Sequence, residues 1–294
     1  KKYLQQQIDF YKKLNQLKRN EMTPSEQLHL DAAEYAHMRL ELYKKGKKDE
    51  PSNYRPINVA SVLSKIMEQI VKDAIQSHLQ LHKLIDLSQH GFMPGRSCTT
   101  NMLEHMNYVT RALDNGQSFD TIFLDYKRAF DRVPFRHMLA KIKSHGIDGR
   151  ILAWITDWTK NRTQRVVLNG NQSNLVEFLS SVVQGSVLGP ILFAIYINDL
   201  DRAIDKVNDV LISKFADDTK LGKTISDLSD CKKLQYALDQ LSSWSDLWGM
   251  ELHPGKCVVL HFGLNNPRHK YSINGTLIEA KDSARDLGVL TCDN

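Results

Sequence analysis

The sequence predicts an α+β fold, in which helices and short strands are segregated and do not alternate in regular βαβ units. Amphipathic helical patterns occupy separate stretches of the chain, and short β-rich runs lie between them. The 294 residues, 41% of them apolar and 25% charged, have an ordinary globular composition and suffice for a large core or for two or three subdomains.

Residues 1–50 are predicted to form an atypical helical segment ahead of the main domain. The stretch is rich in Lys, Gln, Glu and Leu and contains no glycine before Gly46, which is typical of one or two solvated helices. A basic loop at 44–56, rich in Gly, Pro, Ser and Asn, interrupts this pattern. We therefore expect a domain boundary there, with residues 51–294 as the main domain.

Further along, apolar residues between 63 and 75 recur at the i, i+3, i+4, i+7 spacing of an amphipathic helix. A loop at 90–100 leads into a second helix that ends near residue 113. The runs TIFLD at 121–125, QRVVLN at 164–169 and VLISKFA at 210–216 are predicted strands.

Pro190 is expected to open an apolar helix, with Ile191 to Ile197 in the core. Leu234, Leu238, Leu241 and Trp248 mark a late helix, and the run CVVLHF at 257–262 reads as a buried strand.

The charge balance suits a polyanionic partner, although many basic enzymes share it. Lys and Arg number 39 against 34 Asp and Glu, which gives a net charge of +5 and a pI near 8.9. The four cysteines lie far apart without C-x-x-C spacing, which indicates reduced thiols. No signal peptide is apparent, and the longest apolar run is far shorter than the roughly 20 residues that span a bilayer. We expect an intracellular protein of the nucleus or cytoplasm, without membrane contact.

Two adjacent acids, Asp217 and Asp218, follow the predicted strand at 210–216. Two unit charges about 4 Å apart repel by roughly 4 kcal/mol at an effective dielectric constant near 20, so a sheltered pair requires a cation. The alternative is a solvated hairpin turn, in which aspartate is a common residue. This stretch alone favours the alternative.

The stretch TIFLDYKRAFDRVP repeats the pattern, because Asp125 closes a second apolar strand. Acids from two strands can converge on Mg²⁺, which prefers oxygen ligands, and two such ions about 4 Å apart promote phosphoryl transfer. The alternative for Asp125 is a helix N-cap. Between the acidic stretches, Gly185 follows Gln184 and would allow the backbone to approach a substrate closely, with a plain turn as the alternative.

Seven blocks of the sequence, in this order, resemble the reverse-transcriptase domain of non-LTR (LINE-like, jockey-type) retrotransposons. They are NYRPINVASVLSKIMEQIV, QHGFMPGRSCTTNM, FLDYKRAFDRVP, QGSVLGPILFAIYINDL, KFADDTKL, WGMELHPGKC and RDLGVL, and they cover about residues 53–290. The resemblance implies the fingers and palm of a right-hand polymerase, with an antiparallel palm sheet packed on helices and the thumb absent or incomplete.

The resemblance also implies a catalytic site. Asp125, Asp217 and Asp218 match the acids that hold two Mg²⁺ ions, with Mn²⁺ as the alternative ion. The main chain at Tyr126 matches a carbonyl that helps to bind the second ion.

Five further residues match groups that bind the incoming nucleotide. Phe130 matches a bulky residue that crowds the sugar 2′ position, while Gln184 and Gly185 match a loop on the nucleotide and template. Arg55 matches an arginine that meets the triphosphate, and Lys256 matches a lysine near the pyrophosphate leaving group. The alternatives are a core aromatic for Phe130 and solvated cations for Arg55 and Lys256.

The implied activity is RNA-directed DNA synthesis, in which a DNA primer 3′-OH attacks a deoxynucleoside triphosphate on an RNA template. Residues 1–45 do not resemble the family's lead-in, and the chain stops soon after the last block, which indicates a truncated or rearranged copy. The alternatives are a catalytically inactive nucleic-acid-binding remnant and a metal-dependent phosphodiesterase, although no general base for the latter is evident.

Overall fold

A computed structural model describes residues 37–43, 54–59, 62–160, 163–168, 171–174, 176–177, 180, 182, 185–204, 207 and 209–293. The chain divides into two compact units, residues 1–61 with 161–178 and residues 62–160 with 179–294. Within the described residues, no helix is both long and apolar enough to cross a membrane.

The smaller unit contains one sheet. Its strands are β1 (His37–Tyr43), β2 (Tyr54–Val59), β4 (Thr163–Leu168), β5 (Asn171–Gln172) and β6 (Val176–Glu177), in the order β2-β1-β4-β5 with β6 also on β4. β1 is antiparallel to β2 and parallel to β4.

The helical prediction for residues 1–50 is wrong at His37–Tyr43, which form β1. Apolar and polar residues alternate along HMRLELY with the two-residue period of a strand, and this local signal is stronger than the helical composition around it. Residues 1–36 lie outside the described part of the chain. The predicted strand at 164–169 is confirmed as β4.

The larger unit begins with α3 (Val62–Leu81) and α4 (Cys98–Asp114), which confirm the two early helices. Its other helices are α5 (Ala129–Arg132), α6 (Phe135–Ser144), α7 (Gly149–Thr159), α8 (Gly189–Ile197), α9 (Leu200–Ile204), α10 (Leu228–Trp248) and the 3₁₀ turn η2 (Pro254–Lys256). In α8 the predicted core run Ile191 to Ile197 is at most 2% exposed. Full burial of such side chains stabilises the fold by roughly 1.5–3 kcal/mol each.

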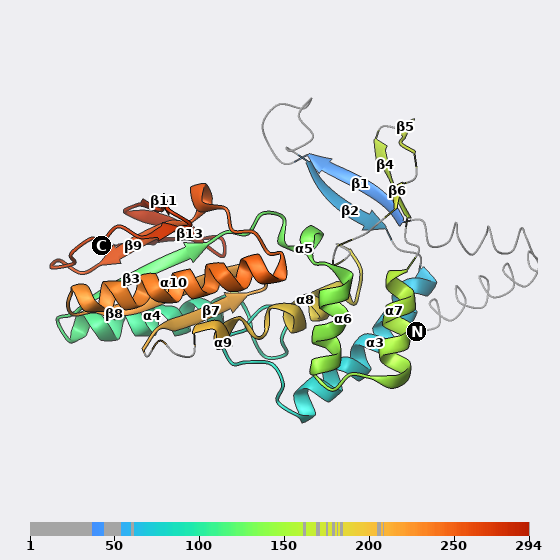
Figure 1. Cartoon of the computed structure of the whole chain (residues 1–294), viewed down its shortest axis with the longest axis horizontal. Coiled ribbons are helices and arrows are strands. Elements are labelled where there is room, and N and C mark those ends of the chain that lie inside the picture. The colour runs from blue at the N-terminus through green and yellow to red at the C-terminus, as the bar shows by residue number, and fades with distance from the viewer. Residues whose placement is uncertain are drawn as a thin grey trace, which may run out of the picture. The chain divides into compact units, whose positions relative to one another are not determined.

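The larger unit contains a five-stranded sheet, on the left of Figure 1, whose strands follow the order β12-β9-β3-β8-β7. Its strands are β3 (Ser118–Leu124), β7 (Leu211–Phe215), β8 (Asp218–Ile225), β9 (Val258–Phe262) and β12 (Glu279–Ala280). The β9-β3-β8-β7 ladder is antiparallel. Two hairpins follow, β10 (Ser272–Ile273) with β11 (Thr276–Leu277) and β13 (Ser283–Asp286) with β14 (Val289–Cys292).

Side chains pack on both faces of the sheet, since successive residues of each strand point to opposite faces. On one face, Val109 and Ala112 of α4 join Phe119, Leu260 and Phe262 in a hydrophobic cluster. On the other face, buried Asp120 accepts hydrogen bonds from His261 Nδ1 at 2.7 Å, Asn266 Nδ2 at 2.7 Å and Tyr271 at 2.6 Å. The ends of β3, β7 and β8 are thus held between two packed layers.

Candidate active site

The β7–β8 hairpin brings Asp217 and Asp218 to one end of the sheet. Phe215 pairs with Asp218, so that the connecting turn consists of Ala216 and Asp217. Ala216 has a φ of 57°, and a positive φ at the first turn residue is typical of tight two-residue hairpins. The alternative reading of this stretch as a hairpin turn is therefore correct about the backbone.

Asp125 lies beside this turn. β3 is antiparallel to β8 with Leu124 opposite Thr219, so the residue after Leu124 comes next to Asp218. The alternative role of Asp125 as a helix N-cap is wrong, because Arg128 precedes the first residue of α5.

The carboxylates influence each other's ionisation. Burial, followed by the charges of Asp217, Asp286 and Asp125, raises the pKa of Asp218 from 3.8 to about 6. Asp218 nevertheless keeps solvent access, so the repulsion among the neighbouring acids acts at a surface that a ligand can reach. The turn therefore differs from the solvated hairpin of the alternative reading, in which no charges would converge.

Residues 251–253 fix the backbone around Asp125. His253 N–H donates to the Asp125 carbonyl at 2.8 Å, Lys127 N–H donates to Glu251 O at 2.7 Å, and Tyr126 forms a bridge with Leu252. Successive carbonyls of an extended chain point to opposite edges, so the Tyr126 carbonyl points away from residues 251–253. The Tyr126 side chain is buried.

Among the described residues, Lys256 is the cation that pairs with Asp125. It closes the η2 turn and places Nζ 3.7 Å from Asp125 Oδ1, with 60% of its own side chain exposed. The Oδ1 atom is buried and accepts no hydrogen bond from the described residues. A pocket of about 250 Å³ opens here and is lined by Asp125, Asp218 and Lys256, together with Lys220, Arg285 and Asp286.

The chemistry of these groups suits a divalent cation, but the arrangement of the described side chains does not form a complete metal site. Among the described residues, no three His, Cys, Asp or Glu side chains are arranged to hold a metal ion. The donors are nevertheless carboxylate oxygens, which Mg²⁺ prefers. The buried Asp125 oxygen without a hydrogen bond and the raised pKa of Asp218 both indicate negative charge that a cation would neutralise. The donor chemistry therefore fits the group, without a preformed three-carboxylate cage.

Phe130 is half-buried. Its ring stacks on Phe193 of α8 with centroids 4.2 Å apart, and Phe92 approaches edge-on at 6.3 Å. Its carbonyl accepts a hydrogen bond from Val182 N–H at 2.6 Å. One face of the ring packs on Phe193, and part of the side chain remains accessible. This arrangement is compatible both with a core aromatic and with a residue that crowds the sugar 2′ position.

The remaining predicted residues are described to different extents. Gly185 is exposed with a φ of 94°, a conformation that glycine adopts without steric cost. Gln184 lies outside the described residues. Arg55 is on β2 in the smaller unit, and only its backbone is described.

Sequence reasoning missed Glu68 of α3, which is fully buried. Its carboxylate accepts hydrogen bonds from Val187 N–H at 2.7 Å and Leu188 N–H at 3.3 Å, just before α8, and from the Trp158 indole at 3.2 Å. An acid at this place balances the positive end of the helix dipole and orders the stretch after Gly185. The only available signal was a single acid within an apolar helical pattern.

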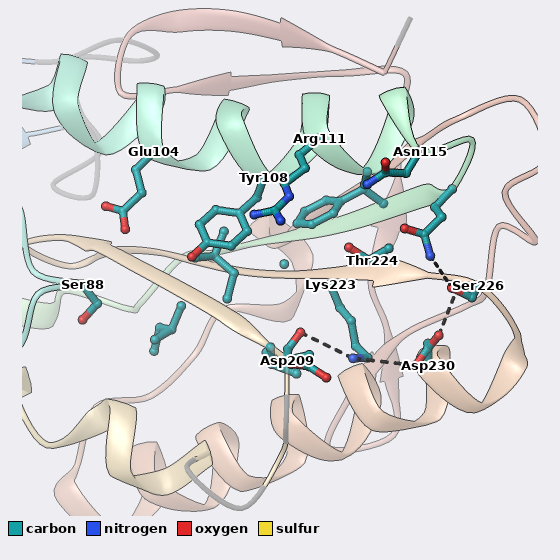
Figure 2. Close-up of a pocket in the computed structure, with 17 residues that line it drawn as sticks. Ser88, Glu104, Tyr108, Arg111, Asn115, Asp209, Lys223, Thr224, Ser226 and Asp230 are labelled. Carbon is teal, nitrogen blue, oxygen red and sulfur yellow. Dashed lines mark hydrogen bonds and ion pairs between the residues drawn. The ribbon is translucent and has the colours of Figure 1, made fainter.

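A larger pocket of about 680 Å³ lies between α4, β7 and β8, and none of the predicted site residues lines it (Figure 2). Within it, Lys223 Nζ donates to the Asp209 carbonyl at 3.4 Å and lies 3.7 Å from the Asp230 carboxylate. The protein itself therefore neutralises this lysine, and the smaller pocket beside Asp125 and Asp218 remains the candidate active site.

The chain is similar in sequence to proteins that are already known. The family model described as reverse transcriptase (RNA-dependent DNA polymerase) matches residues 43–290. The RNA-directed DNA polymerase from mobile element jockey of Drosophila melanogaster is 29% identical over 255 residues, which are 84% of this chain and 28% of that protein. The probable RNA-directed DNA polymerase from transposon BS, also of Drosophila melanogaster, is 25% identical over 85% of this chain and 28% of its own length. The chain thus spans little more than a quarter of these relatives.

Among solved structures, telomerase from Candida tropicalis in complex with a TWJ fragment of telomeric RNA matches with a TM-score of 0.58 and 14% identity, over 95% of this chain and 48% of that one. Telomerase from Candida albicans, in a similar complex, matches with a TM-score of 0.56 and 12% identity over 84% of this chain and 45% of that one. At these identities, the likeness concerns the mixed helix-and-sheet fold.

Proposed function

Because the chain belongs to the reverse transcriptase (RNA-dependent DNA polymerase) family, we propose that it contains the fingers and palm of an RNA-directed DNA polymerase from a non-LTR retrotransposon. The observation that most supports this function is the closeness of three acids at one end of the sheet, two of which, Asp125 and Asp218, line the same pocket. Asp125 from the end of β3 and Asp217 from the β7–β8 turn both raise the pKa of Asp218.

In this proposal Asp125, Asp217 and Asp218, with the Tyr126 carbonyl, hold two Mg²⁺ ions, or Mn²⁺ as the alternative. When bound, these ions supply the positive charge that activates the primer 3′-OH and stabilises the oxygen that leaves the α-phosphate. The protein contributes by fixing its acids on two paired strands, so that little reorganisation is needed at the moment of reaction. Lys256 is the candidate proton donor to the pyrophosphate.

Other residues would select and orient the nucleotide. Phe130 would crowd the sugar 2′ position, Gly185 and Gln184 would pack on the base and template, and Arg55 would bind the triphosphate in a bidentate manner. The ring of Phe130 is supported by its stack on Phe193, which suits a group that must resist displacement by a 2′-OH.

The proposed partners are an RNA template, a DNA primer and deoxynucleoside triphosphates, in the nucleus or cytoplasm. The excess of Lys and Arg supports contact with phosphates, which contributes a salt-sensitive and sequence-independent share of nucleic-acid binding.

Primer extension tests the proposal. The chain is incubated with a DNA primer on a homopolymer RNA template and the matching deoxynucleotide, with Mg²⁺, with Mn²⁺, or with a chelator. Extension that requires the divalent ion is the expected result. RNA binding without any extension, in this chain and in a longer protein that contains it, would instead favour the inactive remnant.

A further inference from the structure

The turn that carries the candidate acids has an unfavourable backbone. Ala216 adopts a φ of 57°, and in this left-handed conformation the Cβ of a residue other than glycine crowds the following carbonyl oxygen. Such a conformation persists only where surrounding contacts over-determine it. The identity of those contacts decides how Asp217 and Asp218 are oriented, because both follow directly from this residue.

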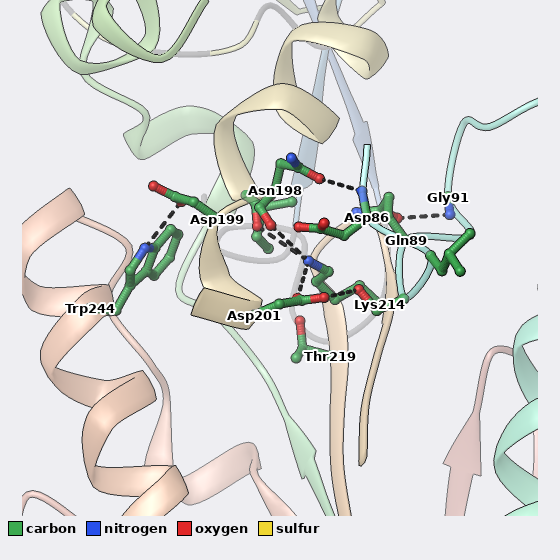
Figure 3. Close-up of polar contacts among 12 residues, drawn as sticks. Asp86, Gln89, Gly91, Asn198, Asp199, Asp201, Lys214, Thr219 and Trp244 are labelled. Carbon is green, nitrogen blue, oxygen red and sulfur yellow. Dashed lines mark hydrogen bonds and ion pairs between the residues drawn. The ribbon is translucent and has the colours of Figure 1, made fainter. Parts of the chain in front are cut away.

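The contact to the Ala216 amide comes from Gln89, which is fully buried in the loop between α3 and α4. Gln89 Oε1 accepts the Ala216 N–H at 3.1 Å and the Gly91 N–H at 2.8 Å (Figure 3). One acceptor shared by two amides fixes the direction of the Ala216 N–H, and therefore the start of the turn.

The loop that carries Gln89 is itself fixed against β7. Lys214 N–H donates to Ser88 O at 2.8 Å, and His90 N–H donates to Lys214 O at 2.8 Å. Arg96 donates through Nη1 to the Gln89 carbonyl at 2.9 Å and also to the carbonyl of Leu87. The loop around Gln89 is therefore firmly held against β7.

The side chain of Lys214 also holds strand β7 in place. Its Nζ is paired with Asp201 and lies 3.3 Å from the Asn198 carbonyl, so that β7 is held to the end of α8 (Figure 3). The strand that leads into the turn is therefore held in place up to Lys214.

Gly91 completes the arrangement. A Cβ built on Gly91 would overlap the Ala216 amide nitrogen and stand 2.9 Å from the Phe215 carbonyl carbon. Only glycine lets the loop approach closely enough for Gln89 to reach the turn. We call Gln89 and Gly91 together the turn clamp.

We propose that Gln89 is a positioning residue, which sets the orientation of Asp217 and Asp218 by holding the Ala216 amide. The inference rests on the proposed polymerase function for its consequence in catalysis. Gln89 Nε2 is buried and has no hydrogen-bond partner among the described residues. An apolar side chain of similar size would avoid that cost, so the amide is explained by its acceptor oxygen and not by packing.

The test compares Gln89→Leu, which removes the acceptor, with Gln89→Glu, which keeps an acceptor oxygen for both amides. Gln117→Leu is the control, because Gln117 is partly exposed and donates to Ser226 far from the turn. Hydrogen exchange of residues 213–218 is measured first, because it needs no activity. Gln89→Leu should speed this exchange by about tenfold. Gln89→Glu and the control should keep the parent rate.

The functional readouts are the thermal shift caused by Mn²⁺ and the kinetics of primer extension. Gln89→Leu should reduce the shift and lower kcat by about tenfold or more, with the nucleotide KM nearly unchanged, since misplaced acids affect the reaction more than binding. If Gln89→Leu does not fold, Gly91→Ala tests the same clamp and should also speed exchange.

Parent-like exchange in Gln89→Leu, or equally fast exchange in Gln89→Glu, would overturn the clamp. Parent kcat in a Gln89→Leu chain with loosened exchange would overturn its catalytic role. A parent that is inactive both as this chain and within a longer protein that contains it would instead contradict the polymerase function, and exchange and the Mn²⁺ shift would still decide for or against the clamp.

Discussion

Lys220 Nζ lies 2.6 Å from Asp286 Oδ2, and the two side chains are only 4% and 6% exposed. This ion pair joins β8 to the β13–β14 hairpin, which corresponds to the block RDLGVL. Its two charges also act on the active site, because Asp286 raises the pKa of Asp218 and Lys220 lowers it. The hairpin therefore affects the ionisation of the site as well as its shape.

Asp286→Asn should destabilise the protein by about 3–5 kcal/mol, because it leaves the Lys220 ammonium buried without its counter-charge. Replacing both residues, as Lys220→Met with Asp286→Leu, should recover most of this loss. Denaturant unfolding measures both variants. Asp282→Asn is the control, because the Arg268–Asp282 pair is exposed with atoms 3.9 Å apart, and it should cost less than about 1 kcal/mol. A double variant as unstable as the single one would contradict this account.

Asp217→Asn should abolish nucleotide addition and leave the fold intact, since it removes a carboxylate charge at nearly constant size. Asp125→Asn should behave alike. The measurement is Mg²⁺-dependent primer extension, with circular dichroism to check folding. Extension by either variant at a rate near that of the parent would remove these acids from the catalytic site.

Asp218→Asn should change how stability depends on pH. The folded-state pKa of about 6 exceeds the usual 3.8, so the folded protein binds more protons between these values and loses stability as pH rises through about 6. The variant lacks this loss and should melt a few degrees higher than the parent at pH 7, with no difference near pH 4. Added Mg²⁺ should narrow the gap at pH 7 by stabilising the parent. Equal melting curves at both pH values would refute the charge crowding.

His105 should make the protein sensitive to acid. Burial, and next the charge of Lys220, lower the pKa of this histidine from 6.5 to about 3. The unfolded state therefore binds more protons below pH 6.5, and stability falls as pH drops from 6.5 toward 3. His105→Gln, which can keep the 2.9 Å hydrogen bond to Thr121, should give a flatter profile of unfolding free energy. His82→Gln, at an exposed position, serves as the control and should follow the parent.

Phe130→Val should admit ribonucleotides while it retains deoxynucleotide addition, because a clash with the 2′-OH disappears when the ring is removed. The decisive quantity is the ratio of deoxynucleotide to ribonucleotide incorporation efficiency. If the ring is only a core aromatic stacked on Phe193, truncation will instead cost about 1–3 kcal/mol of stability and leave that ratio unchanged.

Local patterns in the sequence predicted the elements that position the site. The strands before Asp125 and Asp217 and the helix after Pro190 follow from short-range apolar periodicity, and each is present. Strand β1 was missed, because the composition of residues 1–50 outweighed the alternation in seven residues.

The contacts made by Gln89, Glu68 and Asp286 could not be predicted from local patterns. Each of these polar side chains is buried by partners far away in the chain, such as Ala216, Val187 and Lys220. A polar residue usually predicts an exposed position, whereas these three side chains are buried and bonded to partners that only the assembled fold brings near.

The place of β3 in the middle of the sheet has a consequence for synthesis on the ribosome. β3 is complete at Leu124, yet its two neighbours begin only at Asp218 and Val258. Until those residues have emerged, both edges of an apolar strand stay unpaired, and such edges invite pairing with other chains. The nascent protein should therefore depend on chaperones through much of its translation, and the candidate acids can meet only after most of the larger unit has been made.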